Sequence, residues 1–215
     1  MKKYKVLIST KTQELILAKI FCFDIIGEGI IYSEYKKETL VSHYTGIQAF
    51  AKRFQPPGPT KDEKVRLRTL YSLGLLDTLP EERFDTITAK CSKDLDMPVV
   101  IVNLVDRNRQ WFKSIQWECP GEAPPETPRD ISFCGHTILL EGADTLLCVE
   151  NTLDDDRFAE NPAVTGPLNV RFYAGVPIMV PSTSSGRLTN VGTFCVVDQK
   201  PRQLSHLQEK KLLQY

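Results

Sequence analysis

Apolar and polar residues in the second half of the chain follow patterns typical of β-strands. The β-branched run PVVIVNLVD (98–106) and the segment RQWFKSI (109–115) flank the turn-like DRN, and together they predict a hairpin. Three later runs have the same character: TLLCVE (145–150), VRFYAGVPIMV (170–180) and NVGTFCVVD (190–198). The polar stretch PSTSSGRLT separates the last two runs and predicts the loop of a second hairpin.

Helical periodicity flanks these strands. Residues 62–76 carry apolar side chains largely at helical spacing, with Gly74 near the end. A second helix is predicted from Pro80 to about Leu95, because proline and the acidic residues that follow it suit a first helical turn. A third begins in SHLQEKKLLQY and is unfinished at Tyr215, which predicts a fragment, a short gene product or a truncated gene model. Helices beside an antiparallel sheet amount to an α+β domain.

A proline-rich segment marks a boundary near the N-terminal quarter of the chain. RFQPPGPTKDEK, residues 53–64, brings three prolines and a glycine together and so disfavours regular hydrogen-bonded structure. We therefore expect residues 1–55 to form an N-terminal extension of unknown role and residues 56–215 to form one domain.

Composition and charge exclude several classes of protein. Lysine plus arginine (27) balance aspartate plus glutamate (27), so no net charge attracts nucleic acid or an anionic membrane. No apolar run approaches the ~20 residues of a membrane-spanning helix. The six cysteines show no short repeated spacing, which suits reduced thiols better than a disulfide framework. We expect a cytoplasmic protein that binds neither nucleic acid nor membrane.

The segment ISFCGH (131–136) holds a cysteine and a histidine two positions apart. On a helix capped by Asp130 or Ser132, side chains two residues apart point about 200° away from each other, so Cys134 and His136 would not act as nucleophile and base. A cysteine near a helix N-terminus can still have a lowered thiol pKa, which leaves a redox role for Cys134 open. The alternative is that Cys134 is core and His136 is hydrogen-bonded in a pocket wall.

Arg171 and Tyr173 stand out in the strand-like run RFYAGVPI (171–178). Strand alternation places both on one face, while Phe172 and Ala174 line the other. A charged residue in so apolar a segment needs a partner. That partner would be an anionic ligand or an internal carboxylate such as Asp155 or Asp198.

Motifs for catalysis, nucleotide hydrolysis or metal binding are missing from the sequence. There is no phosphate-binding loop, no nucleophile elbow and no H-E-x-x-H. Apart from Cys134 and His136, potential metal ligands show no paired spacing, so no metal site is expected. The residues assign no cofactor and no catalytic group.

Six segments occur in an order that resembles a known family. They are LGLLDTLPEERFD (73–85), LVDRNRQWFKS (104–114), ETPRDISFCGH (126–136), DDRFAENPAVTGP (155–167), RFYAGVPI (171–178) and GTFCVVDQKPRQLS (192–205). From about Asp62 to Tyr215 the chain resembles a GAF domain of the type found at the input end of bacterial sensor kinases and diguanylate cyclases. The resemblance implies a central antiparallel sheet with N- and C-terminal helices on one face. On the other face it implies a pocket covered by loops and short helices.

The resemblance also implies a function. The chain would be a small-molecule-binding or redox-sensing regulatory module in signal transduction, without catalysis of its own. Its pocket wall would include Phe133, Cys134 and His136 from the covering segment, with Arg171 and Tyr173 from the strand. Its partners would be a small-molecule ligand, a second copy bound through the terminal helices, and an output signalling domain or protein. Two alternatives stay open: a thiol-based redox enzyme using Cys134, and a ligand-free dimerisation scaffold.

Overall fold

The computed structural model describes residues 54–142 and 145–215, together with the backbone of two short strands near the N-terminus. Backbone contacts divide the chain into two units, Met1–Ile47 and Gln48–Tyr215. In the first unit β1 (Ile25–Ile26) and β2 (Gly29–Ile30) pair antiparallel. Almost all of the predicted extension, residues 1–55, lies outside the described residues. No helix in the described ranges is long and apolar enough to cross a membrane.

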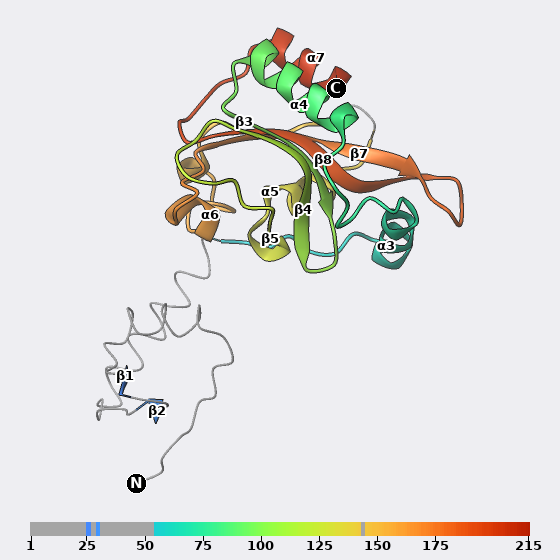
Figure 1. Cartoon of the computed structure of the whole chain (residues 1–215), viewed down its shortest axis with the longest axis horizontal. Coiled ribbons are helices and arrows are strands. Elements are labelled where there is room, and N and C mark those ends of the chain that lie inside the picture. Colours follow the sequence, from blue (N-terminus) through green and yellow to red (C-terminus); the bar gives the residue numbers. More distant parts are fainter. Residues whose placement is uncertain (1–24, 27–28, 31–53, 143–144) are drawn as a thin grey trace. The chain divides into compact units, whose positions relative to one another are not determined.

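A six-stranded antiparallel sheet forms the centre of the second unit (Figure 1). The strand order is β5-β4-β3-β8-β7-β6. The strands are β3 (Val99–Val105), β4 (Arg109–Trp117), β5 (Glu126–Pro128), β6 (Leu147–Val149), β7 (Phe172–Pro181) and β8 (Leu188–Asp198). Both predicted hairpins, β3–β4 and β7–β8, are confirmed. All seven residues of β3 are buried, which requires cover on both faces of the sheet and confirms the predicted α+β class.

Two helices cover one face of the sheet (Figure 1). Cys91 and Leu95 of α4 (Glu82–Leu95) and Leu212 of α7 (His206–Gln214) pack in one apolar cluster with Phe172 and Phe194 of the sheet. A capping box begins α7: the Ser205 hydroxyl accepts from the backbone N–H of Gln208, and the Gln208 side chain accepts from the backbone N–H of Ser205. The period of two along each strand then sends the intervening side chains to the opposite face.

Short helices and loops cover that opposite face. They are η1 (Arg129–Ile131), α5 (Phe133–Thr137), η2 (Thr152–Asp154) and α6 (Pro162–Thr165). The Phe133 ring of α5 stacks between Phe158, with centroids 4.3 Å apart, and Tyr173 of β7, with centroids 5.1 Å apart. This aromatic stack anchors the covering segment to the strands.

The two N-terminal helices of this unit differ from their predicted bounds for local reasons. The helix α3 (Glu63–Ser72) ends about one turn before the predicted limit at residue 76, because Gly74 adopts a positive φ of 61°. The helix α4 begins at Glu82, after the predicted Pro80. Lys113 Nζ donates to the Leu79 carbonyl at 2.8 Å and pairs with Glu81, which holds the residues before α4 outside the helix.

Candidate functional site

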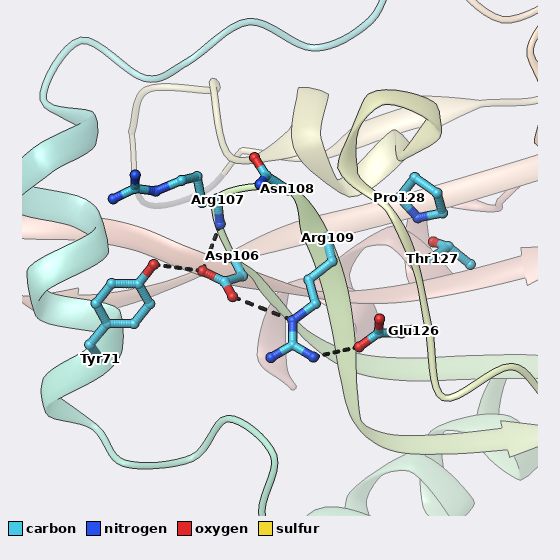
Figure 2. A pocket seen from close by; sticks show the side chains of 8 residues that line it. All are labelled: Tyr71, Asp106, Arg107, Asn108, Arg109, Glu126, Thr127 and Pro128. Carbon is cyan, nitrogen blue, oxygen red and sulfur yellow. Dashed lines mark hydrogen bonds and ion pairs between the residues drawn. The ribbon is translucent and has the colours of Figure 1, made fainter. Parts of the chain in front are cut away.

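One hollow lies on the surface at the turn between β3 and β4. It encloses about 470 Å³ and is lined by Tyr71, Asp106, Arg107, Asn108, Arg109, Glu126, Thr127 and Pro128. Figure 2 shows that its central side chains bind one another. The Tyr71 hydroxyl donates to Asp106 at 2.8 Å, and Arg109 donates to Asp106 at 3.4 Å and to Glu126 at 2.5 Å. Most of the charge in this hollow is therefore neutralised internally, as in a surface ion-pair network.

A second, smaller hollow is a cavity of about 70 Å³ between the sheet and the segments around α5 and α6. Its walls are mostly apolar, and the residues that line it are Val99, Ile101, Gln110, Phe112, Trp117, Cys119, Pro124, Thr127, Ile131, Phe133, Cys134, Ala163, Leu168, Val170, Tyr173, Cys195, Val197, Asp198 and Gln199. Ligand pockets typically measure about 300–1,000 Å³, so a ligand of ordinary size would require the covering segment to move outward. Few polar groups within apolar walls make this cavity the candidate site.

A cluster of thiol, hydroxyl and amide groups includes three residues of the cavity wall, Cys134, Tyr173 and Cys195. The Cys134 Sγ atom lies 3.7 Å from Cys195 Sγ and 2.7 Å from Asn103 Nδ2. The Tyr173 hydroxyl donates to the same sulfur at 3.4 Å. Asn103 also donates to Thr193 Oγ1 at 2.7 Å. Cys134 is only 4% exposed, and its sulfur atom is surrounded by hydrogen-bond donors of the protein.

These neighbours shift the pKa values of the Cys134 and Cys195 thiols in opposite directions. Burial by itself raises the pKa of the Cys134 thiol, but hydrogen bonds from Cys195, Thr193, Tyr173 and Asn103 outweigh burial and lower that pKa to about 7. The pKa of Cys195 moves the other way, because its hydrogen bond to Cys134 and its burial both favour the protonated thiol. Cys134 is therefore the thiol that ionises first, and Cys195 retains its proton.

Gln110 of β4, which lines the cavity, carries an unpaired acceptor. Gln110 Nε2 donates to Thr127 Oγ1 at 2.5 Å, while the Oε1 atom is buried and has no partner among the described residues. Exchanging the two atoms by flipping the amide would leave the nitrogen without a partner instead. In either orientation one amide atom of Gln110 is left without a hydrogen bond beside a mostly apolar cavity.

Three of the five predicted site residues line this cavity: Phe133, Cys134 and Tyr173. The predicted helical separation of Cys134 and His136 is confirmed, since Ser132 caps α5 by accepting from the Gly135 amide at 2.8 Å. His136 lies outside the lining and donates from Nε2 to the Gln55 carbonyl oxygen at 2.8 Å.

Arg171 also lies outside the lining, and its partners differ from those predicted. Its Nη1 atom donates to the backbone carbonyls of Val164 at 2.9 Å and Val170 at 3.0 Å. Within the described residues, Asp155 pairs with Arg157 and Asp198 pairs with Arg202 instead. The carbonyl oxygens of Val164 in α6 and of Val170 therefore accept from the guanidinium that the sequence assigned to a carboxylate or an anion.

The sequence interpretation missed Asn103, Gln110 and Cys195 as members of the site. Asn103 is a polar residue inside the apolar run of β3, and that interruption was the available signal. The pairing of Asn103 with Thr193 across β3 and β8 depends on the strand register, which local patterns do not specify. In the described part of the chain, no three His, Cys, Asp or Glu side chains form a group that could hold a metal ion.

Comparisons with known proteins agree with this architecture. The model of the GAF domain family matches residues 79–215. A cyclic di-GMP phosphodiesterase of Pseudomonas aeruginosa is 36% identical over 147 residues, which are 68% of this chain and 23% of that relative. The chain thus spans about a quarter of that relative's length.

Two solved structures are similar at lower identity. The GAF domain of an Acinetobacter phosphoenolpyruvate-protein phosphotransferase aligns with a TM-score of 0.46 and 17% identity, over 69% of this chain and 86% of that one. The blue-light-absorbing form of the PixJ GAF domain from Thermosynechococcus elongatus aligns with a TM-score of 0.48 and 16% identity, over 69% of this chain and 81% of that one.

Proposed function

This chain belongs to the GAF domain family, and on that premise we propose that it is a regulatory module whose small-molecule ligand occupies the cavity between the sheet and α5. The observation that carries the proposal is the unpaired amide oxygen of Gln110, a residue that lines the cavity. Leaving a buried acceptor without a partner costs about 1–3 kcal/mol. A ligand that donates a hydrogen bond to Gln110 Oε1 removes that cost when it binds.

The cavity walls narrow the chemistry of the ligand. Phe112, Trp117 and Phe133 supply aromatic surface, and no lysine or arginine is among the lining residues. Such walls suit a compact apolar or aromatic body that carries an N–H or O–H group, and they disfavour a highly charged ligand such as a polyphosphate. Ordered water bound to Gln110 is the competing occupant.

The strands provide a route from the cavity to the helices. In β7 Tyr173 faces the cavity, while its neighbours Phe172 and Ala174 pack in the cluster with α4 and α7. A ligand that displaces the covering segment therefore acts on strands that also support both helices. The ligand shifts the packing of α4 and α7 only to the extent that its affinity for one helix arrangement exceeds its affinity for the other.

A binding experiment with matched variants tests this assignment. Thermal shift and calorimetry would be run on the full chain with a panel of small aromatic amines and alcohols, amino acids, nucleotides and tetrapyrroles. Gln110→Leu removes the unpaired acceptor at similar volume and should weaken binding about tenfold or more. The control is Gln116→Leu, because Gln116 of the same strand donates to Thr88 of α4 on the other side of the sheet. Absence of any saturable shift, or equal affinity in Gln110→Leu, would leave water as the occupant and remove the proposal.

The proposed regulation also involves partners outside the described domain. Most of the Pseudomonas aeruginosa phosphodiesterase lies outside the segment matched here, which supports a role for this chain as the input to a separate output activity. We propose in addition that two copies associate through their terminal helices, where Leu207 of α7 is 69% exposed. Light scattering that finds only monomers at micromolar concentration would refute this association and, with it, a scaffold role.

A further inference from the structure

Cys134 and Cys195 are a pair of buried thiols brought together from α5 and β8. They lie 61 residues apart in the sequence, and their sulfur atoms are 3.7 Å apart. A disulfide bond is about 2.05 Å long, so the two atoms must approach by about 1.7 Å to form one. Cys134 belongs to a five-residue helix in the covering segment, whereas Cys195 is in a central strand, so α5 is the element that would move.

The surroundings give the two sulfur atoms different roles. Asn103 and Tyr173 direct an N–H and an O–H at Cys134, which stabilises a thiolate there. The Cys195 thiol is the neighbouring donor and stays protonated until Cys134 has reacted. The remaining described cysteines lack this arrangement: burial raises the pKa of Cys91 to about 12 and that of Cys148 to about 11.

Both sulfur-bearing residues line the cavity, so a reactant that enters it lies next to them. The volume of about 70 Å³ admits only a small molecule while the covering segment stays in place. The mostly apolar walls favour an uncharged reactant over an anion. A small hydroperoxide meets these conditions, and its O–O bond is the bond that a thiolate cleaves.

We propose that Cys134 and Cys195 form a dithiol that reduces a small hydroperoxide and becomes an intramolecular disulfide. This activity goes beyond ligand binding at Gln110 and does not depend on it. The product disulfide joins α5 to β8, and so changes the wall of the same cavity.

The chemistry proceeds in two steps. The ionised Cys134 sulfur attacks the terminal oxygen of the hydroperoxide, the O–O bond breaks, and the leaving oxygen takes up the proton that the Cys134 thiol released. The products are a sulfenic acid on Cys134 and an alcohol, or water when the oxidant is hydrogen peroxide. Cys195 then attacks the Cys134 sulfur, the S–O bond breaks, and the hydroxide that departs takes the Cys195 proton to form water. Two thiols are oxidised by two electrons in total, and one hydroperoxide is reduced.

Peptide mass spectrometry of the full chain tests the proposal. The reduced protein is exposed to hydrogen peroxide at several pH values, quenched with an alkylating agent and digested, and the state of every cysteine is quantified. Cys134 and Cys195 should lose their free thiols together, in one linked peptide, at least about tenfold faster than Cys148 is oxidised. The rate should rise with pH and reach half its maximum near pH 7, which follows from the lowered pKa of Cys134.

Variants distinguish the role of Cys134 from that of Cys195. In Cys195→Ser the Cys134 sulfenic acid should persist long enough to be captured by dimedone, while Cys148→Ser, the matched control, should behave as wild type. Three results would overturn the proposal: oxidation of Cys134 no faster than that of Cys148, a disulfide that joins Cys119 or another cysteine, or a disulfide only between two chains. The wild-type measurement decides these points even if a variant fails to fold. Ligand-induced thermal shift is a separate readout, so either proposal can fail alone.

Discussion

Replacing Glu63 with glutamine removes the carboxylate shared by two buried guanidinium groups. Glu63 begins α3, and its oxygens accept from Arg66 Nη2 at 2.6 Å and from Arg129 Nη1 at 2.6 Å. The side chains of Arg66 and Arg129 are 1% and 7% exposed, and that of Glu63 is 20% exposed. Arg66 also donates to the Val105 carbonyl at 2.5 Å, so the network joins α3 to the end of β3 and to η1.

The expected cost follows from what remains after the substitution. Removing one partner of a buried ion pair costs about 3–5 kcal/mol, because the other charge stays buried without compensation. Glutamine can still accept one hydrogen bond, and part of Glu63 faces solvent. We therefore expect the lower end, about 3 kcal/mol, which lowers the melting temperature of a domain of this size by roughly 6–12 °C.

The pH dependence provides a second, independent signature. Burial opposes ionisation of Glu63, but hydrogen bonds from Arg66 and Arg129 outweigh it and hold the pKa of Glu63 well below its usual range. The folded state therefore binds this proton less readily than the unfolded chain does. The stabilisation is fully present above the unfolded pKa of about 4.3 and is lost as the pH falls toward the folded pKa. Glu63→Gln should lack this part of the acid destabilisation.

Urea denaturation followed by tryptophan fluorescence measures both effects, since Trp111 packs beside α3. The matched control is Glu141→Gln, whose exposed ion pair with Lys61 should make no measurable difference to the free energy of unfolding. A loss below about 1 kcal/mol in Glu63→Gln would refute the reasoning. So would acid destabilisation equal to that of wild type.

Two further substitutions test packing and protonation elsewhere. A Cβ atom at Gly192 would lie 2.0 Å from the Asn103 carbonyl oxygen, so Gly192→Ala should lower the free energy of unfolding in urea by about 2 kcal/mol. The control Gly58→Ala should be nearly neutral, because a Cβ atom there would have nothing within 4 Å. Burial lowers the pKa of His136, so the unfolded chain binds that proton more readily and the protein should lose stability as pH falls below about 6.5. His136→Gln should flatten thermal unfolding profiles between about pH 7 and pH 5, and an unchanged slope, or an equal effect of the exposed His206→Gln, would contradict this account.

Local patterns predicted the regular elements because their periodicity is contained within each segment. The β-branched run at 98–106 and the alternation at 170–180 became β3 and β7 within one or two residues. Element ends were harder to predict. Gly74 ends α3 through its own backbone angle, whereas Lys113 of β4 binds the Leu79 carbonyl and holds the residues before α4 outside the helix. Helix limits follow from local conformation and from distant side chains together.

Local periods of two and of 3.6 residues were sufficient to predict the α+β class and the faces of Cys134 and Tyr173. The family was recognised from the order of the six matching segments, and Phe133 was placed in the pocket wall through that resemblance. Tertiary contacts were needed to bring Cys195 to Cys134, to turn Arg171 toward Val164, and to leave the Oε1 atom of Gln110 without a partner. The reason is physical: these contacts depend on strand register and loop path between segments far apart in the chain, and no local preference encodes the distance between them.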